Sequence, residues 1–373
     1  MMDHEFTDQL KGVLRARFGE HAEDVYEKSP MLQYLNIKSR SAHRGSKARG
    51  SFANFYAIYV LVEDYLAHGF NKEGDYSGYE GARFKDLFRR QRELPFGNRL
   101  QNHALNHRMN EEFRKYFPQS TFIPILRDVS TNRYWINENL LKVTANSNLY
   151  NIASVLIDII DLYVKTKRHA FNSFIQTCER LTNIDKESAN AIEEFILSLL
   201  ATNVDARIFE IVTYAILKYY YDEQMVYLGF EIDHITKENL KLYKTGRTNA
   251  NDGGIDFVMR PLGRFFQVTE TLDVRKYFLD IDKIEHYPLT FVIKSEKSVD
   301  YLRRQLEDKA RKQYSVAAIV RQYLNCIEEV INIPALEERF RETVKKNRIR
   351  DVLEEIIKQS KVEFNHRGSD EDG

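Results

Sequence analysis

Cysteine is scarce in this 373-residue sequence, and long apolar runs are missing from it. The two cysteines, Cys178 and Cys326, lie far apart in the chain. This pattern indicates reduced interior thiols and excludes both a disulfide framework and a cysteine-based zinc site. No run of about 18 apolar residues occurs, so we do not expect a membrane-spanning helix. The sequence shows no signal peptide, and a cytoplasmic location is the resulting expectation.

Net charge is lacking as well, because 55 lysines and arginines balance 55 aspartates and glutamates. A protein that binds DNA need not be basic overall, but a neutral one must segregate its charges. Apolar residues make up 43% of the chain, which is ordinary for a folded globular protein and argues against disorder. The length suffices for two or three domains with a large core.

Two turn signals between residues 251 and 270 predict a β-hairpin. Asp252-Gly253-Gly254 forms the first turn, because two glycines allow the positive φ values of a tight bend. A short apolar strand is predicted at 255–259, a second turn at 261–263 and a second strand at 265–270.

Polar side chains are placed at defined positions of this hairpin. Asp256 and Glu270 lie at its two ends, and Gln267 and Thr269 share one face of the second strand because side chains alternate sides. A carboxylate beside a polar pair on an adjacent strand can hold a hard cation such as Mg²⁺ through oxygen ligands. On spacing alone, an ordinary hairpin with solvated acidic ends explains the pattern equally well.

The stretch Asp252-Gly-Gly-Ile-Asp256, followed by a strand, a turn and a strand with Gln267-x-Thr269, resembles the core of the PD-(D/E)xK nucleases. It is most similar to the Mrr-like branch, in which Asp-Gly-Gly-Ile-Asp is followed by Gln-x-Lys and a Phe-Glu pair lies on a preceding helix. Here Phe209-Glu210 lies within a predicted helix at 205–218, and 228–232 looks like the first strand. The resemblance covers roughly residues 203–300.

This resemblance implies an α/β (α+β) PD-(D/E)xK nuclease core, joined to a mainly α-helical N-terminal domain. It implies a Mg²⁺ ion held by Asp256 and Gln267, with Glu210 assisting. The cation would polarise the scissile phosphate of DNA and lower the pKa of a bound water. A nuclease core with a large companion domain fits a type II restriction endonuclease that cuts double-stranded DNA at a specific sequence. We therefore expect a homodimer and a companion DNA methyltransferase.

One position departs from the family pattern. The residue at the family's lysine position is Thr269, which carries no charge. Lys218 is one candidate replacement, because residues 210, 214 and 218 recur at helical spacing on one face. Lys294, at the end of a predicted strand beginning at Leu289, is a second, and Glu270 is a third candidate as a displaced acid.

Cations cluster in three places that could contact DNA phosphates. Five cations and no acid lie between residues 38 and 49, among small residues that let the backbone approach phosphates. The candidate contacts are Arg40, Arg44, Lys47 and Arg49 in this stretch, Arg89 and Arg90 in a basic helical segment, and Lys244 and Arg247 in a predicted basic loop before the hairpin. The alternative is that each stretch is simply solvated surface.

The rest of the pattern predicts an α-rich N-terminal half. Helices are predicted at 4–35, 52–68, 83–117 with a break at 95–97, 137–165, 170–200, 298–331 and 337–361. Short strands are predicted at 122–127 and 132–136, and loops at 69–82 and 273–286. We expect a DNA-binding domain at 1–200, the nuclease domain at 201–335, and a C-terminal helix with an acidic tail at 336–373.

Two other functions stay open from the sequence. One is a Mrr-like nuclease that acts on modified DNA or on repair intermediates. The other is a DNA-binding protein with a decayed nuclease fold, which Thr269 in place of lysine would suggest.

Overall fold

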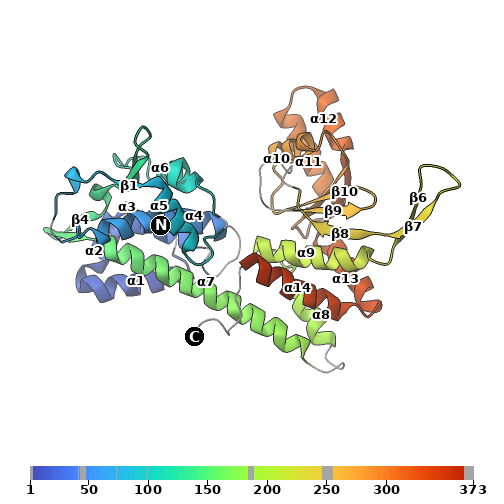
Figure 1. Cartoon of the computed structure of the whole chain (residues 1–373), viewed down its shortest axis with the longest axis horizontal. Coiled ribbons are helices and arrows are strands. Elements are labelled where there is room, and N and C mark those ends of the chain that lie inside the picture. Colours follow the sequence, from blue (N-terminus) through green and yellow to red (C-terminus); the bar gives the residue numbers. More distant parts are fainter. Residues whose placement is uncertain are drawn as a thin grey trace. The chain divides into compact units, whose positions relative to one another are not determined.

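The computed structural model describes residues 3–40, 42, 48–72, 74–98, 100–183, 189–245 and 255–364. The protein is mixed α/β, with a mostly helical N-terminal half and a five-stranded mixed sheet in the C-terminal part (Figure 1). It divides into two compact units, Met1–Phe174 (unit 1) and Ile175–Gly373 (unit 2). The functional domains, with boundaries after residues 200 and 335, remain predictions. Among the described residues, no helix is long and apolar enough to cross a membrane.

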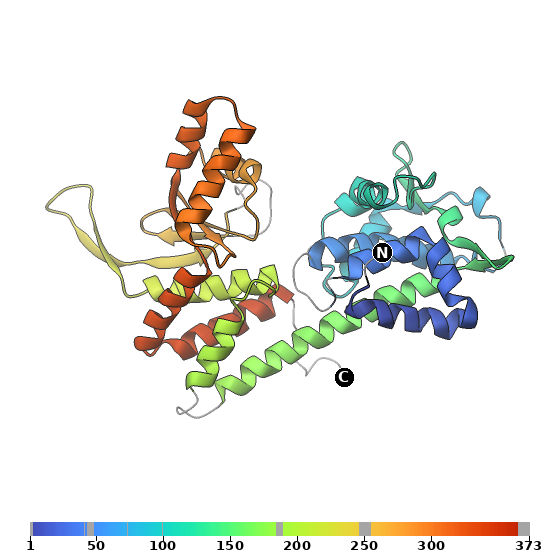
Figure 2. The same ribbon diagram turned by 180° about the vertical axis from the view of Figure 1, so that it is seen from behind.

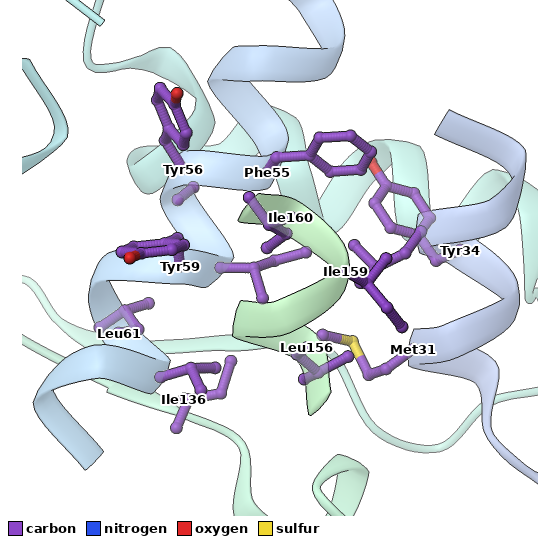
Figure 3. Close-up of a cluster of buried hydrophobic side chains, with 14 of the residues drawn as sticks. Met31, Tyr34, Phe55, Tyr56, Tyr59, Leu61, Ile136, Leu156, Ile159 and Ile160 are labelled. Atoms are coloured by element: carbon purple, nitrogen blue, oxygen red, sulfur yellow. The ribbon is translucent and has the colours of Figure 1, made fainter. Parts of the chain in front are cut away.

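Unit 1 is built mainly from helices. They are α1 (Glu5–Phe18), α2 (Ala22–Lys28), α3 (Pro30–Ser39), α4 (Ala48–Ala67), α5 (Phe84–Glu93), a π-helical turn (Ala104–Arg108), α6 (Met109–Tyr116) and the first part of α7 (Ala153–Thr182). Helix α4 is apolar on nearly all sides and is therefore buried. Figure 3 shows its side chains meeting those of α3 and α7 in the core, with Ile136 beside them.

Two small sheets accompany these helices. Strands β1 (Ala82–Arg83), β3 (Arg133–Ile136) and β2 (Ile125–Asp128) form one antiparallel sheet, which confirms the predicted strand pair near residue 130. Strands β4 (Lys142–Ala145) and β5 (Asn148–Asn151) form a hairpin where a helix was predicted from residue 137. That prediction was wrong because Asn146 and Ser147 both adopt positive φ, the geometry of a tight two-residue hairpin turn.

Unit 2 contains the remaining elements (Figure 2). Its helices are α8 (Ala189–Ser198), α9 (Ala206–Tyr221), α10 (Val274–Lys283), α11 (Val299–Gln313), α12 (Ala317–Asn325), α13 (Ile333–Lys345) and α14 (Ile349–Phe364). Its strands are β6 (Met225–Leu228), β7 (Thr236–Asn239), β8 (Lys241–Lys244), β9 (Phe257–Arg260), β10 (Arg264–Thr269), β11 (Leu289–Ile293) and β12 (Ile327–Ile331).

The main sheet has the order β12-β11-β10-β9-β8. Strands β8, β9 and β10 are antiparallel, whereas β10, β11 and β12 run parallel. The predicted hairpin is confirmed: Phe257 pairs with Phe266 and Met259 with Arg264. Helix α9 packs on one face of this sheet, where the ring of Tyr221 lies 6.2 Å from that of Phe266. Helices α10, α11 and α12 cover the other face through the core that contains Phe291.

Several predicted elements of unit 2 were wrong. The segment 228–232 is not the first strand of the main sheet, because β6 ends at Leu228 and pairs with β7 in a separate two-stranded sheet. The first strand is β8, which lies in the predicted basic loop. The predicted loop at 273–286 forms α10, since Asp273 caps its N-terminus and three large apolar side chains on it are buried.

The predicted single helices at 170–200, 298–331 and 337–361 are each divided. The first separates into the end of α7 and α8. The second forms α11, α12 and strand β12, whose Ile327–Ile331 run is rich in β-branched residues. The third is split after α13, where Asn347 takes a positive φ that ends the helix.

Candidate active site

Helix α9 carries Glu210 to one face of the sheet. The helix begins after Asp205, whose carboxylate accepts the backbone N–H of Arg207 at 2.7 Å and caps the first turn. One turn beyond Glu210, the ring of Tyr214 packs 5.3 Å from the ring of Phe257 in β9. Glu210 is therefore held close to the sheet and is only 8% exposed, an unusual environment for a carboxylate.

Two cations compensate the charge of Glu210. The ammonium of Lys244, at the end of β8, lies 3.5 Å from Glu210 Oε1. The guanidinium of Arg207 pairs with Oε2, and its Nε also lies 3.2 Å from Glu363 Oε1 of α14. Lys244 was predicted as a phosphate contact in a loop; the structure places it on a strand and beside the predicted catalytic glutamate.

Asp256 immediately precedes β9 and is fixed by backbone bonds. Its N–H donates to the carbonyl of Phe266 at 3.0 Å, and its carbonyl accepts from the N–H of Thr245 at 3.0 Å. Its carboxylate oxygen Oδ2 accepts the N–H of Val268 at 2.7 Å. Because Phe266 pairs with the residue after Asp256, the register sets Asp256 opposite Gln267 on the neighbouring strand.

The pKa of Asp256 is raised to about 7. Burial is the main cause, and the negative charge of Glu210 adds to it. The N–H of Val268 and the positive charges of Arg207 and Lys276 act in the opposite direction. Since Arg207 lies on α9 and Lys276 on α10, Asp256 senses charges from both helices that flank the sheet. The shift also indicates that Asp256 and Glu210 lie close enough to repel each other.

Gln267 has a buried oxygen that the described residues leave unpaired. The residue is 5% exposed and lies beside Phe291 on the face covered by α10. Its amide nitrogen donates weakly to the carbonyl of Val268 at 3.4 Å. Its Oε1 accepts no hydrogen bond from any part of the chain that the structure describes. A buried amide oxygen without a partner is costly, and a hard cation is one group that would satisfy it.

These donors match a hard cation such as Mg²⁺ better than a transition metal. Asp256 supplies a carboxylate and Gln267 an unpaired amide oxygen, while the carboxylate of Glu210 on α9 acts on Asp256 through its charge. All three are oxygen donors, as Mg²⁺ prefers. Within the described ranges, no group of three or more histidine, cysteine, aspartate or glutamate side chains could hold one metal ion. The site therefore depends on the amide and on two carboxylates.

Thr269 and Lys218 are held by partners of their own. The hydroxyl of Thr269 donates to the carbonyl of Thr271 at 3.2 Å and accepts its N–H at 3.3 Å. The ammonium of Lys218 donates to the buried Glu355 of α14 at 2.8 Å. Lys218 lies on α9 two turns beyond Glu210, as predicted. Its ammonium group pairs with Glu355 of α14 and not with Glu210.

Glu270 and Lys294 form a second pair beside α9. The Lys294 ammonium lies 2.8 Å from Glu270 Oε1 and also donates to the carbonyl of Val204, just before α9. It lies 5.6 Å from the centre of the Phe209 ring, next in sequence to Glu210. Lys294 is buried, whereas Glu270 is exposed.

The predicted DNA contacts in unit 1 have different surroundings. Arg40 is exposed at the end of α3. Arg89 is exposed on α5 and pairs with Asp86 at 2.8 Å, whereas Arg90 donates two hydrogen bonds of 2.8 Å to Glu63. Three predicted contacts lie outside the described residues, namely Arg44, Lys47 and Arg247, as does the side chain of Arg49.

Arg207 is the site residue that the sequence analysis missed. It precedes Glu210 by three residues on α9, a spacing at which oppositely charged side chains meet on a helix. That signal was present but is common on helices. Lys244 was predicted to contact a phosphate beside the metal, but its strand was missed because β8 carries few apolar residues and was interpreted as a loop.

Comparisons with known proteins do not identify a relative for this arrangement. A scan against protein-family models, a search of curated proteins and a search of solved structures each found no match to this chain.

Proposed function

We propose that this protein is a Mg²⁺-dependent DNA endonuclease of the PD-(D/E)xK type, and specifically a type II restriction endonuclease. The observation that carries the proposal is the position of Asp256. Its carboxyl has a pKa raised by burial and by Glu210, and it lies across the strand pair from the unpaired oxygen of Gln267. An acid whose pKa is raised by burial and by the charge of a second acid is a recurrent mark of catalytic sites.

The fold around the site supports the same proposal. The hairpin of β9 and β10 is followed by β11, which runs parallel to β10, and α9 packs across the hairpin. This order agrees with the resemblance found in the sequence, namely a helix with glutamate followed by a hairpin with aspartate and glutamine. Asp256, Gln267 and Glu210 would hold the cation. When bound, Mg²⁺ would neutralise charge on the phosphate and lower the pKa of a water.

Lys244 is the residue to which we assign the role of the missing lysine. Its ammonium lies 3.5 Å from Glu210, and its strand pairs it with Phe257, the neighbour of Asp256. A positive group at this place would stabilise the charge that develops on the phosphate. Lys294 is paired with Glu270 and Lys218 with Glu355 of α14, whereas the acid that Lys244 pairs with is the site residue Glu210.

Unit 1 would supply much of the contact with double-stranded DNA. Exposed Arg40 and Arg89 are suited to phosphates, which fix position without reading sequence. We propose that the enzyme acts as a homodimer, because two active sites related by a twofold axis cut both strands of a symmetric sequence. A companion DNA methyltransferase would protect the host sequence.

The decisive experiment is a cleavage assay with Mg²⁺ on unmethylated and methylated duplex DNA. We expect Asp256→Asn to abolish cleavage while DNA binding in Ca²⁺ survives. Cleavage at wild-type rates by this variant would disprove the assignment of Asp256. If the protein cuts methylated DNA and leaves unmethylated DNA intact, the Mrr-like alternative is favoured.

The decayed-nuclease alternative has one observation in its favour. The hydroxyl of Thr269, at the family's lysine position, is hydrogen-bonded to Thr271 of the following turn. If the wild-type protein binds DNA but cuts none of the substrates with Mg²⁺ or Mn²⁺, the protein is a binding module and the endonuclease proposal fails.

A further inference from the structure

The hairpin formed by β6 and β7, residues Met225–Asn239, is here called the arm. Its two strands pair with each other and form a separate sheet. Figures 1 and 2 show it extending away from the rest of unit 2. A two-stranded hairpin on its own is marginally stable in water. The arm is therefore expected to gain stability from a partner.

Large apolar side chains cover the outer part of the arm. Ile232 is 88% exposed and Tyr227 68%, Phe230 is fully exposed, and Ile235 is also exposed. Single exposed apolar residues are normal on a protein surface, but several within one short segment mark an interaction site. The solvent exposure of these four side chains indicates a docking surface.

The turn of the arm has a defined shape. A Cβ atom on Gly229 would lie 2.4 Å from the carbonyl oxygen of His234, so the turn closes tightly around a glycine. The N–H of His234 donates to the carbonyl of Glu231 at 3.1 Å, and the two side chains meet at 2.9 Å. At the base, the Asn239 amide donates to the carbonyl of Asp222 at 3.0 Å.

The charge of the arm identifies the class of its partner. The arm contains three carboxylates, on Glu231, Asp233 and Glu238, and one lysine, Lys237. Its net charge is therefore −2 when His234 is neutral. Such a segment is repelled by the phosphates of DNA. A protein surface that is both apolar and basic is its electrostatic complement.

Unit 2 itself presents a surface of that kind, here called the α10–α12 face. Helices α10 and α12 are joined by the stacked rings of Phe278 and Tyr323, 4.2 Å apart. Exposed apolar side chains lie on α10 and at the start of α12: Leu279, Val316 and Ile319. Beside them, between α10 and α11, is a cleft of about 480 Å³ lined by the cations Arg275, Lys309 and Lys312, together with Asp273.

We infer that the arm of one copy of this chain docks on the α10–α12 face of a second copy. The apolar tip meets Leu279, Val316 and Ile319, and the arm's carboxylates face the basic cleft. In a twofold dimer both arms make this contact, because a twofold interface repeats each interaction. Stable complexes bury a total area of roughly 1,200–2,000 Å², so each of the two contacts would have to supply about half of it. This inference does not depend on the proposed nuclease activity.

The first test measures the mass of the intact protein in solution by analytical ultracentrifugation. We expect a dimer for the wild type, and at least about tenfold weaker dimerisation for Phe230→Ser/Ile232→Ser, since central apolar anchors dominate interfaces. The matched control is Val129→Ser/Leu149→Ser, which removes two exposed apolar residues from unit 1. Unchanged circular dichroism and Tm would show that the arm variant is folded.

The second test identifies the docking surface. Both native cysteines, Cys178 and Cys326, are buried, so a new exposed cysteine reacts selectively with a bismaleimide. The double variant Ile232→Cys/Ile319→Cys should give a covalent dimer, whereas neither single variant should give one.

Four results would overturn the inference. They are a wild-type monomer throughout the micromolar range, a dimer insensitive to the arm variant, cross-linking of the double-cysteine variant only within one chain, and loss of DNA binding by the arm variant with its dimerisation unchanged. The last result would instead make the arm a DNA contact. If the arm variant loses dimerisation, this inference is supported even when the wild-type protein cuts no DNA. The test of the arm is therefore separate from the test of the proposed function.

Discussion

The substitution Asp256→Asn should stabilise the protein, and by more at higher pH. The pKa of Asp256 in the folded protein is raised to about 7, while the ordinary value in an unfolded chain is about 3.9. Between these two values the folded state binds more protons than the unfolded state. Stability therefore falls as the pH rises from about 4 to about 7, and it is constant above that range. Asparagine has no such titration.

The size of the effect follows from the shift. Each pKa unit corresponds to about 1.4 kcal/mol, so a shift of about three units sets a ceiling of about 4 kcal/mol at about pH 8. At about pH 5 the titration has covered only about one of these three pKa units, and the expected gain is about 1–2 kcal/mol. The amide oxygen of asparagine can still accept the N–H of Val268, which Asp256 accepts at 2.7 Å, so the geometry is retained.

The measurement is the Tm of wild type and variant from about pH 5 to pH 8, without DNA. One kcal/mol shifts Tm by about 2–4 °C for a unit of this size, so the difference should reach several degrees at the upper end. Millimolar Mg²⁺ should raise the Tm of the wild type near pH 8 and leave Asp256→Asn unchanged. Glu296→Gln, which removes an exposed carboxylate of unit 2, is the control for a general charge effect.

Two outcomes would refute this reasoning. If Asp256→Asn is no more stable than wild type near pH 8, burial and Glu210 do not raise the pKa of Asp256 as described. If the difference is present but does not grow with pH, the gain comes from packing and not from titration. A Mg²⁺ effect that persists in the variant would show that the cation binds elsewhere.

Three further predictions concern the cations. Lys244→Gln should reduce cleavage by on the order of a hundredfold with DNA affinity unchanged, while Lys241→Gln on the same strand should cut normally; equal rates would exclude Lys244 from catalysis. Lys218→Met should lower the free energy of unfolding by about 3 kcal/mol, because the buried Glu355 loses its ion pair and keeps the hydrogen bond from Gln359. Adding Glu355→Leu should recover most of that loss in denaturant titrations. Arg89→Ala should weaken binding to all DNA sequences and flatten the salt dependence by about one unit; an unchanged slope would show that Arg89 is solvated surface.

The parts of the fold that could be predicted have local causes. The hairpin of β9 and β10 followed from turn residues and strand alternation within a short segment, and the structure confirms its pairing. Helix α9 agrees with the helix predicted at 205–218 around Phe209-Glu210, and Asp205 caps its first turn. Strand β11 agrees with the strand predicted from Leu289, and all its residues are buried, as expected for a strand covered on both faces.

The parts that were wrong depend on pairing between distant segments. Strand β8 has one buried residue, Leu242, and becomes a strand because β9 pairs with it. Strand β12 directly follows a helix, and β11 fixes it in the parallel part of the sheet. Strand propensity is strongly context-dependent, so neither segment could be separated from a loop or a helix by its own sequence.

The same limit applies to the candidate site. The spacing of Glu210 and Lys218 correctly placed both on α9, but the partner of Lys218 is Glu355, 137 residues further along the chain. The contact between Lys244 and Glu210 depends on the packing of α9 on the sheet, so residue spacing could not predict it. Motif spacing could therefore predict the candidate acidic residues of the site. The choice of a lysine to accompany them required the tertiary structure.

The electrostatics of the site favour a bound cation at Asp256 in particular. The charge of Glu210 is already compensated by Arg207 and by Lys244. Asp256 is held by a backbone N–H, and its raised pKa means that these surroundings do not fully stabilise its ionised form. A divalent cation between Asp256 and the unpaired oxygen of Gln267 would supply the missing charge and satisfy the oxygen. The same cation would lower the pKa of Asp256 and remove the cost of keeping it ionised near neutral pH, so cation binding and protonation of Asp256 should compete directly.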